Sequence, residues 1–121
     1  MADKLRVGVV GVGYLGRFHA LIYSRMQNVE LAGVNDVDLE QARRVADEAG
    51  CAMLSIEEML EQLDAVSIVV PTTLHLEIAA PFLRKGIHML LEKPISSTIA
   101  EGREIVELAR ASAATLQIGH L

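Results

Sequence analysis

The segment Leu5-Arg-Val-Gly-Val-Val-Gly-Val-Gly-Tyr-Leu-Gly16 decides the fold. Its apolar first half predicts a buried strand, and the G-x-G-x-x-G pattern predicts a tight turn into a helix. Gly11 permits the turn, Gly13 lets a pyrophosphate approach the backbone, and Gly16 allows close packing of the helix on the strand. We predict a dinucleotide-binding turn, the alternative being a turn without a ligand. Its predicted cofactor-binding residues are Gly11, Gly13, Tyr14, Leu15 and Gly16.

Beyond this turn, short apolar runs alternate with segments of helical period, which predicts βαβ units and a parallel sheet buried on both faces. We expect a doubly wound, six-stranded Rossmann sheet in the order 3-2-1-4-5-6, with the ligand beyond the carboxyl ends of the strands. The expected strands are 5–10, 30–34, 51–54, 65–70, 87–91 and 115–119. The expected helices are 14–26, 38–49, a short one from residue 55, 74–85, and one from near residue 98.

Local signals support several of these boundaries. Asp38 is a suitable N-cap and Gly50 a suitable terminator for the second helix, while Ser55-Ile-Glu-Glu58 and the pair Thr98 and Glu101 have the capping-box pattern. Pro81 predicts a kink or a late start of the fourth helix. The first helix carries Leu15, Phe18, Ile22 and Met26 on one face, and the fifth is expected to turn Ile105, Leu108 and Ala109 inward.

Asp36 stands twenty residues after Gly16, just beyond the second predicted strand. A carboxylate there can accept hydrogen bonds from the adenosine ribose and would repel a 2'-phosphate, so the sequence favours NAD over NADP. The next arginine is Arg43, which agrees with this preference. The alternative role for Asp36 is that of a turn residue. Asp38 competes for the ribose but fits better as a helix cap.

The composition limits the classes of protein to which this chain can belong. The 121 residues suffice for about one domain, and a net charge of −5 with scattered Lys and Arg argues against nucleic acid or a membrane surface as partner. The single cysteine, Cys51, and the lack of a signal-peptide or membrane-span pattern favour a cytoplasmic protein. No spacing of His, Cys, Asp or Glu predicts a metal site. His19 is expected to pack or hydrogen-bond within its helix, and His88 to be structural.

Five motifs in order give the chain a resemblance to a known family. They are Gly11-Val-Gly-Tyr-Leu-Gly16, His19-Ala20, Asn35-Asp36, Pro71-Thr-Thr-Leu-His75 and Glu92-Lys93-Pro94. Over its whole length the chain resembles the glucose-fructose oxidoreductase and inositol dehydrogenase family, also called Gfo/Idh/MocA. The resemblance implies NAD as cofactor and hydride transfer to or from a hydroxyl of a sugar, inositol or nucleotide sugar.

The resemblance also implies roles for the last two motifs. Residues Pro71, Thr72 and Thr73 would line the nicotinamide and its ribose, with His75 near the same edge. Glu92, Lys93 and Pro94 would lie beside the nicotinamide, with Lys93 touching the reacting hydroxyl or the cofactor ribose, and a cis bond before Pro94 would be compatible with this turn. An ammonium there would stabilise alkoxide character as hydride leaves, which makes Lys93 the predicted catalytic residue. Without the resemblance, the Glu-Lys-Pro motif would be read as a solvated turn and His75 as a helix-start residue.

Family members carry a second, largely antiparallel domain that builds the substrate pocket and subunit contacts. Residues 1–121 correspond to the first domain alone, so we expect this chain to be inactive by itself, and its full-length parent to be a homo-oligomer acting on a sugar-like substrate. The final Gly119-His120-Leu121 resembles members that act on UDP-linked amino sugars, which favours a nucleotide sugar. The alternative function is an NAD(H) sensor or structural module, which would have no need of Lys93.

Overall fold

Six parallel strands form one sheet in the order β3-β2-β1-β4-β5-β6, as the sequence predicts. The computed structural model describes residues 4–119. The strands are β1 (Leu5–Val10), β2 (Val29–Asn35), β3 (Ala52–Met53), β4 (Ala65–Ile68), β5 (His88–Glu92) and β6 (Leu116–Gly119). The helices are α1 (Tyr14–Arg25), α2 (Leu39–Ala49), α3 (Ile56–Gln62), α4 (His75–Arg84) and α5 (Ile99–Ser112), with a 3₁₀ turn, η1 (Thr72–Leu74), before α4.

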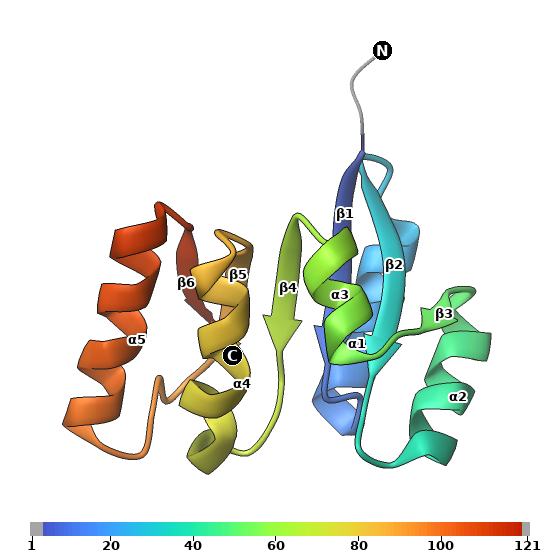
Figure 1. The fold of residues 1–121 in the computed structure, drawn as a ribbon. Coiled ribbons are helices and arrows are strands. Elements are labelled where there is room, and N and C mark those ends of the chain that lie inside the picture. The colour runs from blue at the N-terminus through green and yellow to red at the C-terminus, as the bar shows by residue number, and fades with distance from the viewer. Residues whose placement is uncertain (1–3, 120–121) are drawn as a thin grey trace.

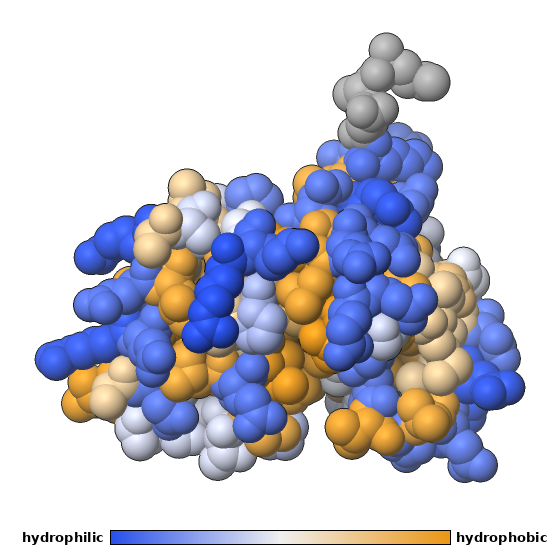
Figure 2. All heavy atoms as spheres, in the orientation of Figure 1, coloured by the Kyte–Doolittle hydropathy of each residue, from blue (hydrophilic) through white to orange (hydrophobic). Residues whose placement is uncertain are grey.

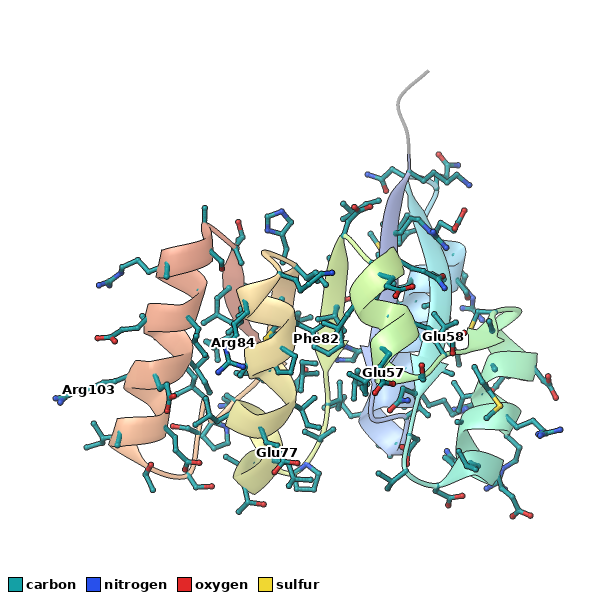
Figure 3. All side chains as sticks on the ribbon, in the orientation of Figure 1. Glu57, Glu58, Glu77, Phe82, Arg84 and Arg103 are labelled. Atoms are coloured by element: carbon teal, nitrogen blue, oxygen red, sulfur yellow. The ribbon has the colours of Figure 1, made fainter. Side chains whose placement is uncertain are left out.

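The sheet separates two hydrophobic cores. Figure 1 shows α3, α4 and α5 in front of the sheet and α1 behind it, with the carboxyl ends of the strands at the lower edge. Phe82, which is completely buried, lies between α4 and β4 and belongs to the front core (Figure 3). Val9, Val34 and Val45 belong to the core on the α1 and α2 side. Burial on both faces explains the nearly continuous apolar runs of β1 and β4.

Helix α1 packs on the sheet through small residues rather than through its large apolar ones. Gly16 and Ala20 are its buried positions, whereas Phe18 is 40% exposed and Ile22 59% exposed. A Cβ atom at Gly16 would overlap the carbonyl oxygen of Gly11, so the helix lies directly against the turn. The periodicity therefore predicts the helix correctly but not the side that packs, because close approach excludes large side chains.

The predicted helix boundaries hold with small differences. Asp38 caps α2, and Gly50 ends it with φ 71°, a left-handed conformation that favours glycine. Ser55 and Glu58 form the complete capping box of α3. At α5 the box is partial: the Thr98 hydroxyl accepts from the Glu101 amide and contacts the Glu101 carboxylate. Inward-facing positions of α5 are as predicted, with Ile105 0% exposed and Ala109 6% exposed.

The segment after β4 departs most from the expectation. β4 ends at Ile68, two residues before the predicted end, and the next two residues, Val69 and Val70, line a cavity. Helix α4 begins at His75 and remains helical through Pro81, so a late start at the proline is wrong. No helix within residues 4–119 is long and apolar enough to span a membrane.

Candidate functional site

The fold itself requires two glycines of the turn between β1 and α1. Gly11 has φ 91°, and a Cβ atom there would run into the carbonyl oxygen of Val69 on the neighbouring strand's continuation. A Cβ atom at Gly16 would collide with the Gly11 carbonyl oxygen, so no side chain fits there. The backbone of this turn is thus held between α1 and the end of β4. A glycine at either position would be needed even if no ligand were bound.

Gly13 is different, because neither conformation nor packing requires a glycine there. Its φ of −68° and ψ of −153° suit other residues, and an added Cβ atom would meet nothing within 4 Å. Gly13 is also the N-cap of α1, and no side chain caps that helix. The helix amides therefore remain free of a side-chain acceptor and face open space next to an exposed backbone. This geometry fits a pyrophosphate lying over Gly13.

Asp36 fastens the turn to the end of β2. One carboxylate oxygen accepts a hydrogen bond from the Val12 amide at 2.8 Å, and the other accepts from the Asp38 amide at 2.9 Å. Each oxygen keeps a second lone pair for a ribose hydroxyl. Asp38 accepts from the Gln41 amide at 3.2 Å and caps α2, so it occupies the capping role predicted for it. Gln41 in turn donates to the Val12 carbonyl oxygen at 2.9 Å, a contact that the sequence did not indicate.

A cavity of ≈ 350 Å³ opens beside this turn, between α3 and α4. Gly11, Gly13, Asp36 and Pro71 line it, and apolar side chains of both helices form its walls. Figure 2 shows hydrophobic surface between these two helices. Apolar walls with a carboxylate at the rim suit a flat heterocycle joined to a ribose. A larger cavity of ≈ 590 Å³ lies along α5 and contains none of the predicted cofactor-binding residues.

His75 lies beneath the surface of this edge rather than on it. Its ring is 1% exposed, with Nε2 3.1 Å from the Val70 carbonyl oxygen and Nδ1 3.1 Å from the Ile95 carbonyl oxygen. The imidazole therefore links the segment after β4 to the segment after β5. Pro71 and Thr73 are exposed beside it, and Thr72 is half-buried. The contact of His75 with a cofactor stays a prediction, and its hydrogen bonds show a role in joining the two loops.

The Glu92-Lys93-Pro94 turn lies at the end of β5, and the Lys93–Pro94 bond is cis. Lys93 and Pro94 are exposed, and the Lys93 amide donates to the Gly119 carbonyl oxygen at 3.3 Å. The Glu92 carboxylate lies 3.0 Å from Nε2 of His19. His19 packs within its own helix, as expected, through an edge-on contact with the Tyr23 ring, but its polar partner comes from β5. No spacing rule connects residues so distant in sequence, and only the His19-Ala20 motif singled the histidine out.

Other reactive groups are remote from this edge or inert. Within residues 4–119, no three His, Cys, Asp or Glu side chains gather so that they could hold a metal ion. Burial raises the pKa of the Cys51 thiol to about 11, so the thiol stays protonated at neutral pH. His88 sits at the amino end of β5, where its Nδ1 accepts from the Thr115 amide at 3.0 Å. His120 and Leu121, part of the predicted Gly-His signal, lie outside the described residues.

Comparisons with known proteins show which proteins this chain is similar to. UDP-N-acetylglucosamine 3-dehydrogenase from Acidithiobacillus ferrooxidans is 42% identical over 118 residues, which are 97% of this chain and 37% of that protein. Its solved structure superimposes with a TM-score of 0.93, covering 98% of this chain and 39% of the other. Inositol 2-dehydrogenase from Corynebacterium glutamicum is 34% identical over 89% of this chain and 34% of its own length. GenD2 from gentamicin A biosynthesis, solved in complex with NAD, is 28% identical with a TM-score of 0.92, covering 98% of this chain and 35% of that chain.

The chain thus spans little more than a third of the length of these relatives. Residues 5–120 match the model of the Gfo/Idh/MocA family, described as an oxidoreductase family with an NAD-binding Rossmann fold. Strand order, glycine turn and relatives agree with one another. This chain therefore belongs to the Gfo/Idh/MocA oxidoreductase family and carries its NAD-binding Rossmann fold, with NAD as cofactor.

Proposed function

We propose that this chain is the cofactor half of an NAD-dependent enzyme that moves hydride between nicotinamide and a hydroxyl of a sugar-like substrate. The observation that carries the proposal is that neither the backbone conformation nor the packing requires a glycine at position 13. A bound pyrophosphate would explain the glycine, because the pyrophosphate would occupy the space that a Cβ atom would enter.

Different residues along the carboxyl edge of the sheet would bind different parts of the cofactor and the substrate. The turn from Gly11 to Gly16 would bind the pyrophosphate through backbone amides, and Asp36 would accept hydrogen bonds from the adenosine ribose. Bound NAD would supply the hydride acceptor. Lys93, exposed at the end of β5, would hydrogen-bond the reacting hydroxyl and stabilise negative charge on its oxygen as hydride leaves.

We further propose a nucleotide sugar as the substrate class, with UDP-linked amino sugars preferred. The similarity to a UDP-N-acetylglucosamine 3-dehydrogenase supports this choice over free inositol. A second domain would contribute most of the substrate pocket and the contacts of a homo-oligomer, which makes residues 1–121 inactive alone. We also propose a cytoplasmic location, for which the single cysteine is the sequence support.

Calorimetric titration of the 121-residue chain with NAD, NADH, NADP and NADPH at one salt concentration tests the cofactor assignment. We expect NAD and NADH to bind more tightly than their phosphorylated counterparts, because a 2'-phosphate would approach the Asp36 carboxylate. Absence of binding by a folded chain, repeated with the chain joined to a second domain, would overturn the assignment.

Lys93→Met tests the catalytic assignment in a protein that contains both domains. We expect turnover to fall by about 10²–10⁴, the usual contribution of general acid–base catalysis, while NAD affinity stays nearly unchanged. Steady-state kinetics and NADH titration measure the two quantities separately. Retained turnover would overturn the catalytic assignment of Lys93, whereas a wild-type protein that binds NAD(H) but shows no turnover would favour the alternative of a sensor or structural module.

A further inference from the structure

A nearly buried pair of ionisable side chains joins helix α1 to the end of β5. His19 Nε2 lies 3.0 Å from Glu92 Oε1, and the two side chains are 12% and 13% exposed. His19 follows Gly16 by three residues, and Glu92 immediately precedes Lys93. The pair therefore connects the helix that begins at the glycine turn to the turn that carries the proposed catalytic lysine.

His19 packs against a neighbour on its own helix α1, and Glu92 lies against the end of β6. The His19 ring meets the Tyr23 ring edge-on, with centroids 6.4 Å apart, and the Tyr23 hydroxyl lies 2.5 Å from the hydroxyl of the fully buried Ser67 on β4. On the far side, a Cβ atom at Gly119 would come within 2.9 Å of Glu92 Oε1. The carboxylate thus lies between α1 and the end of β6.

Fold stability alone is a weak reason for such a pair. Removing a carboxylate from water costs free energy, and apolar replacements of a buried pair often stabilise a protein more. The histidine at the opposite end of β5 differs, since His88 is exposed and its Nδ1 accepts a hydrogen bond from the Thr115 amide. The pair is present at the end of the strand where the ligand is proposed to bind, which indicates a role connected with the ligand.

We propose that His19 is a positioning residue for the nicotinamide end of the site. By donating to the Glu92 carboxylate, it fixes the point where the chain leaves β5 and hence the backbone of Lys93, which is also held by the Gly119 carbonyl oxygen. The inference rests on the proposed function, because it assumes that NAD(H) lies along this edge.

Titration with two ligands on the 121-residue chain tests this role. ADP-ribose shares the adenosine, pyrophosphate and riboses of NADH but lacks the nicotinamide. Replacing His19 by Asn leaves an amide too short to reach Glu92. We expect this variant to bind NADH about fivefold to tenfold more weakly, as for one ordinary hydrogen bond lost, and ADP-ribose within about twofold of wild type.

His19→Gln is the matched control, because its longer side chain places an amide nitrogen near the position of Nε2. We expect it to restore NADH affinity to within about twofold of wild type. A second control, His88→Gln, changes a histidine at the other end of β5 and should alter neither affinity. Replacing Glu92 by Leu should cause the same selective loss as His19→Asn, and the double variant should show no further loss.

The outcomes separate this inference from the proposed function. Equal weakening of NADH and ADP-ribose in His19→Asn, or no weakening of either, would overturn the positioning role while wild-type binding of NADH upholds the cofactor site. If wild type bound neither ligand, either alone or joined to a second domain, the proposed function and this inference would both be overturned. Thermal unfolding of each variant shows whether a change in affinity accompanies a change in fold.

Discussion

Two turns meet at the carboxyl edge of the sheet, and they are held in different ways. The turn from Gly11 to Gly16 is fixed by contacts of backbone with backbone, since a Cβ atom at Gly11 or Gly16 would meet a carbonyl oxygen. The turn from Glu92 to Pro94 is fixed by a side chain, whose carboxylate meets His19 from another helix. The positions of Gly11 and Gly16 therefore have no room for a Cβ atom, whereas a turn held by a side chain can adjust.

This difference also decides what each turn is suited for. A pyrophosphate is common to every dinucleotide, and a rigid backbone cradle that fits it needs no variation. The turn after β5 is proposed to face the reacting carbon and the substrate, where the relatives handle different sugars and inositols. Holding that turn through replaceable side chains leaves the geometry near the chemistry open to change.

Replacing Gly16 by Ala gives the largest expected effect. The new methyl group would overlap the Gly11 carbonyl oxygen, so α1 must move away from the sheet at a cost of about 3 kcal/mol in the free energy of unfolding. Chemical denaturation measures this cost.

Gly13→Ala is the matched control, since its methyl group meets open space: stability should stay within about 0.5 kcal/mol. NAD affinity of that control should nevertheless fall about tenfold or more, as for a lost hydrogen bond to a phosphate. A stable Gly16→Ala variant would contradict the backbone-held description.

Asp36→Ala tests a side chain that supports the first turn. The amides of Val12 and Asp38 would both lose their acceptor, so unfolding should become easier by about 1–3 kcal/mol. NAD affinity should fall more than NADP affinity, because only NAD offers the 2'-hydroxyl that the carboxylate would bind. Denaturation and paired titrations measure these effects. Equal losses for NAD and NADP would remove Asp36 from the ribose role while leaving its structural role intact.

Gly119→Ala is the counterpart of Gly16→Ala at the second turn. Its methyl group would meet the Glu92 carboxylate at 2.9 Å, and this side chain can shift where a backbone cannot. We expect a loss of at most about 1 kcal/mol in stability, compared with about 3 kcal/mol at Gly16. Thermal unfolding of both variants under the same conditions measures the ratio. Similar losses at the two positions would show that both turns are equally rigid.

Alkylation of Cys51 is expected to show the smallest effect, and its rate also reports how readily the other variants unfold. Burial raises the pKa of its thiol to about 11, so at pH 8 the thiolate fraction in the folded chain is on the order of 100-fold below that of the unfolded chain. Alkylation of wild type should be slow and should accelerate as the pH approaches 11. Labelling of Gly16→Ala should be faster than that of Gly119→Ala. Fast labelling of native wild type at pH 8 would contradict the buried thiol.

The structure of the turn from Gly11 to Gly16 can be predicted from the sequence better than that of the turn from Glu92 to Pro94. Glycine spacing, apolar runs and caps such as Asp38 act between neighbours in sequence, so strand order and the first turn follow from the residues alone. The contact between His19 and Glu92 joins residues far apart in the chain and depends on how α1 crosses the sheet. The same tertiary geometry decides that Gly16 and Ala20, rather than Phe18, face the strands.

The double engagement of Asp36 makes cofactor preference hard to re-engineer. Changing an NAD site into one for NADP usually means removing the acidic residue and adding a cation, and the fully exposed Val37 gives room for an arginine. In this chain the acidic residue also receives the Val12 and Asp38 amides, so its removal loosens the frame on which the new cation would stand. We therefore expect a successful switch to keep an acceptor at position 36, such as Ser or Asn. The preference for NAD over NADP and the stability of the fold thus depend on the same carboxylate. Any evolved or designed variant that changes the cofactor preference at this position must also compensate for the lost stability.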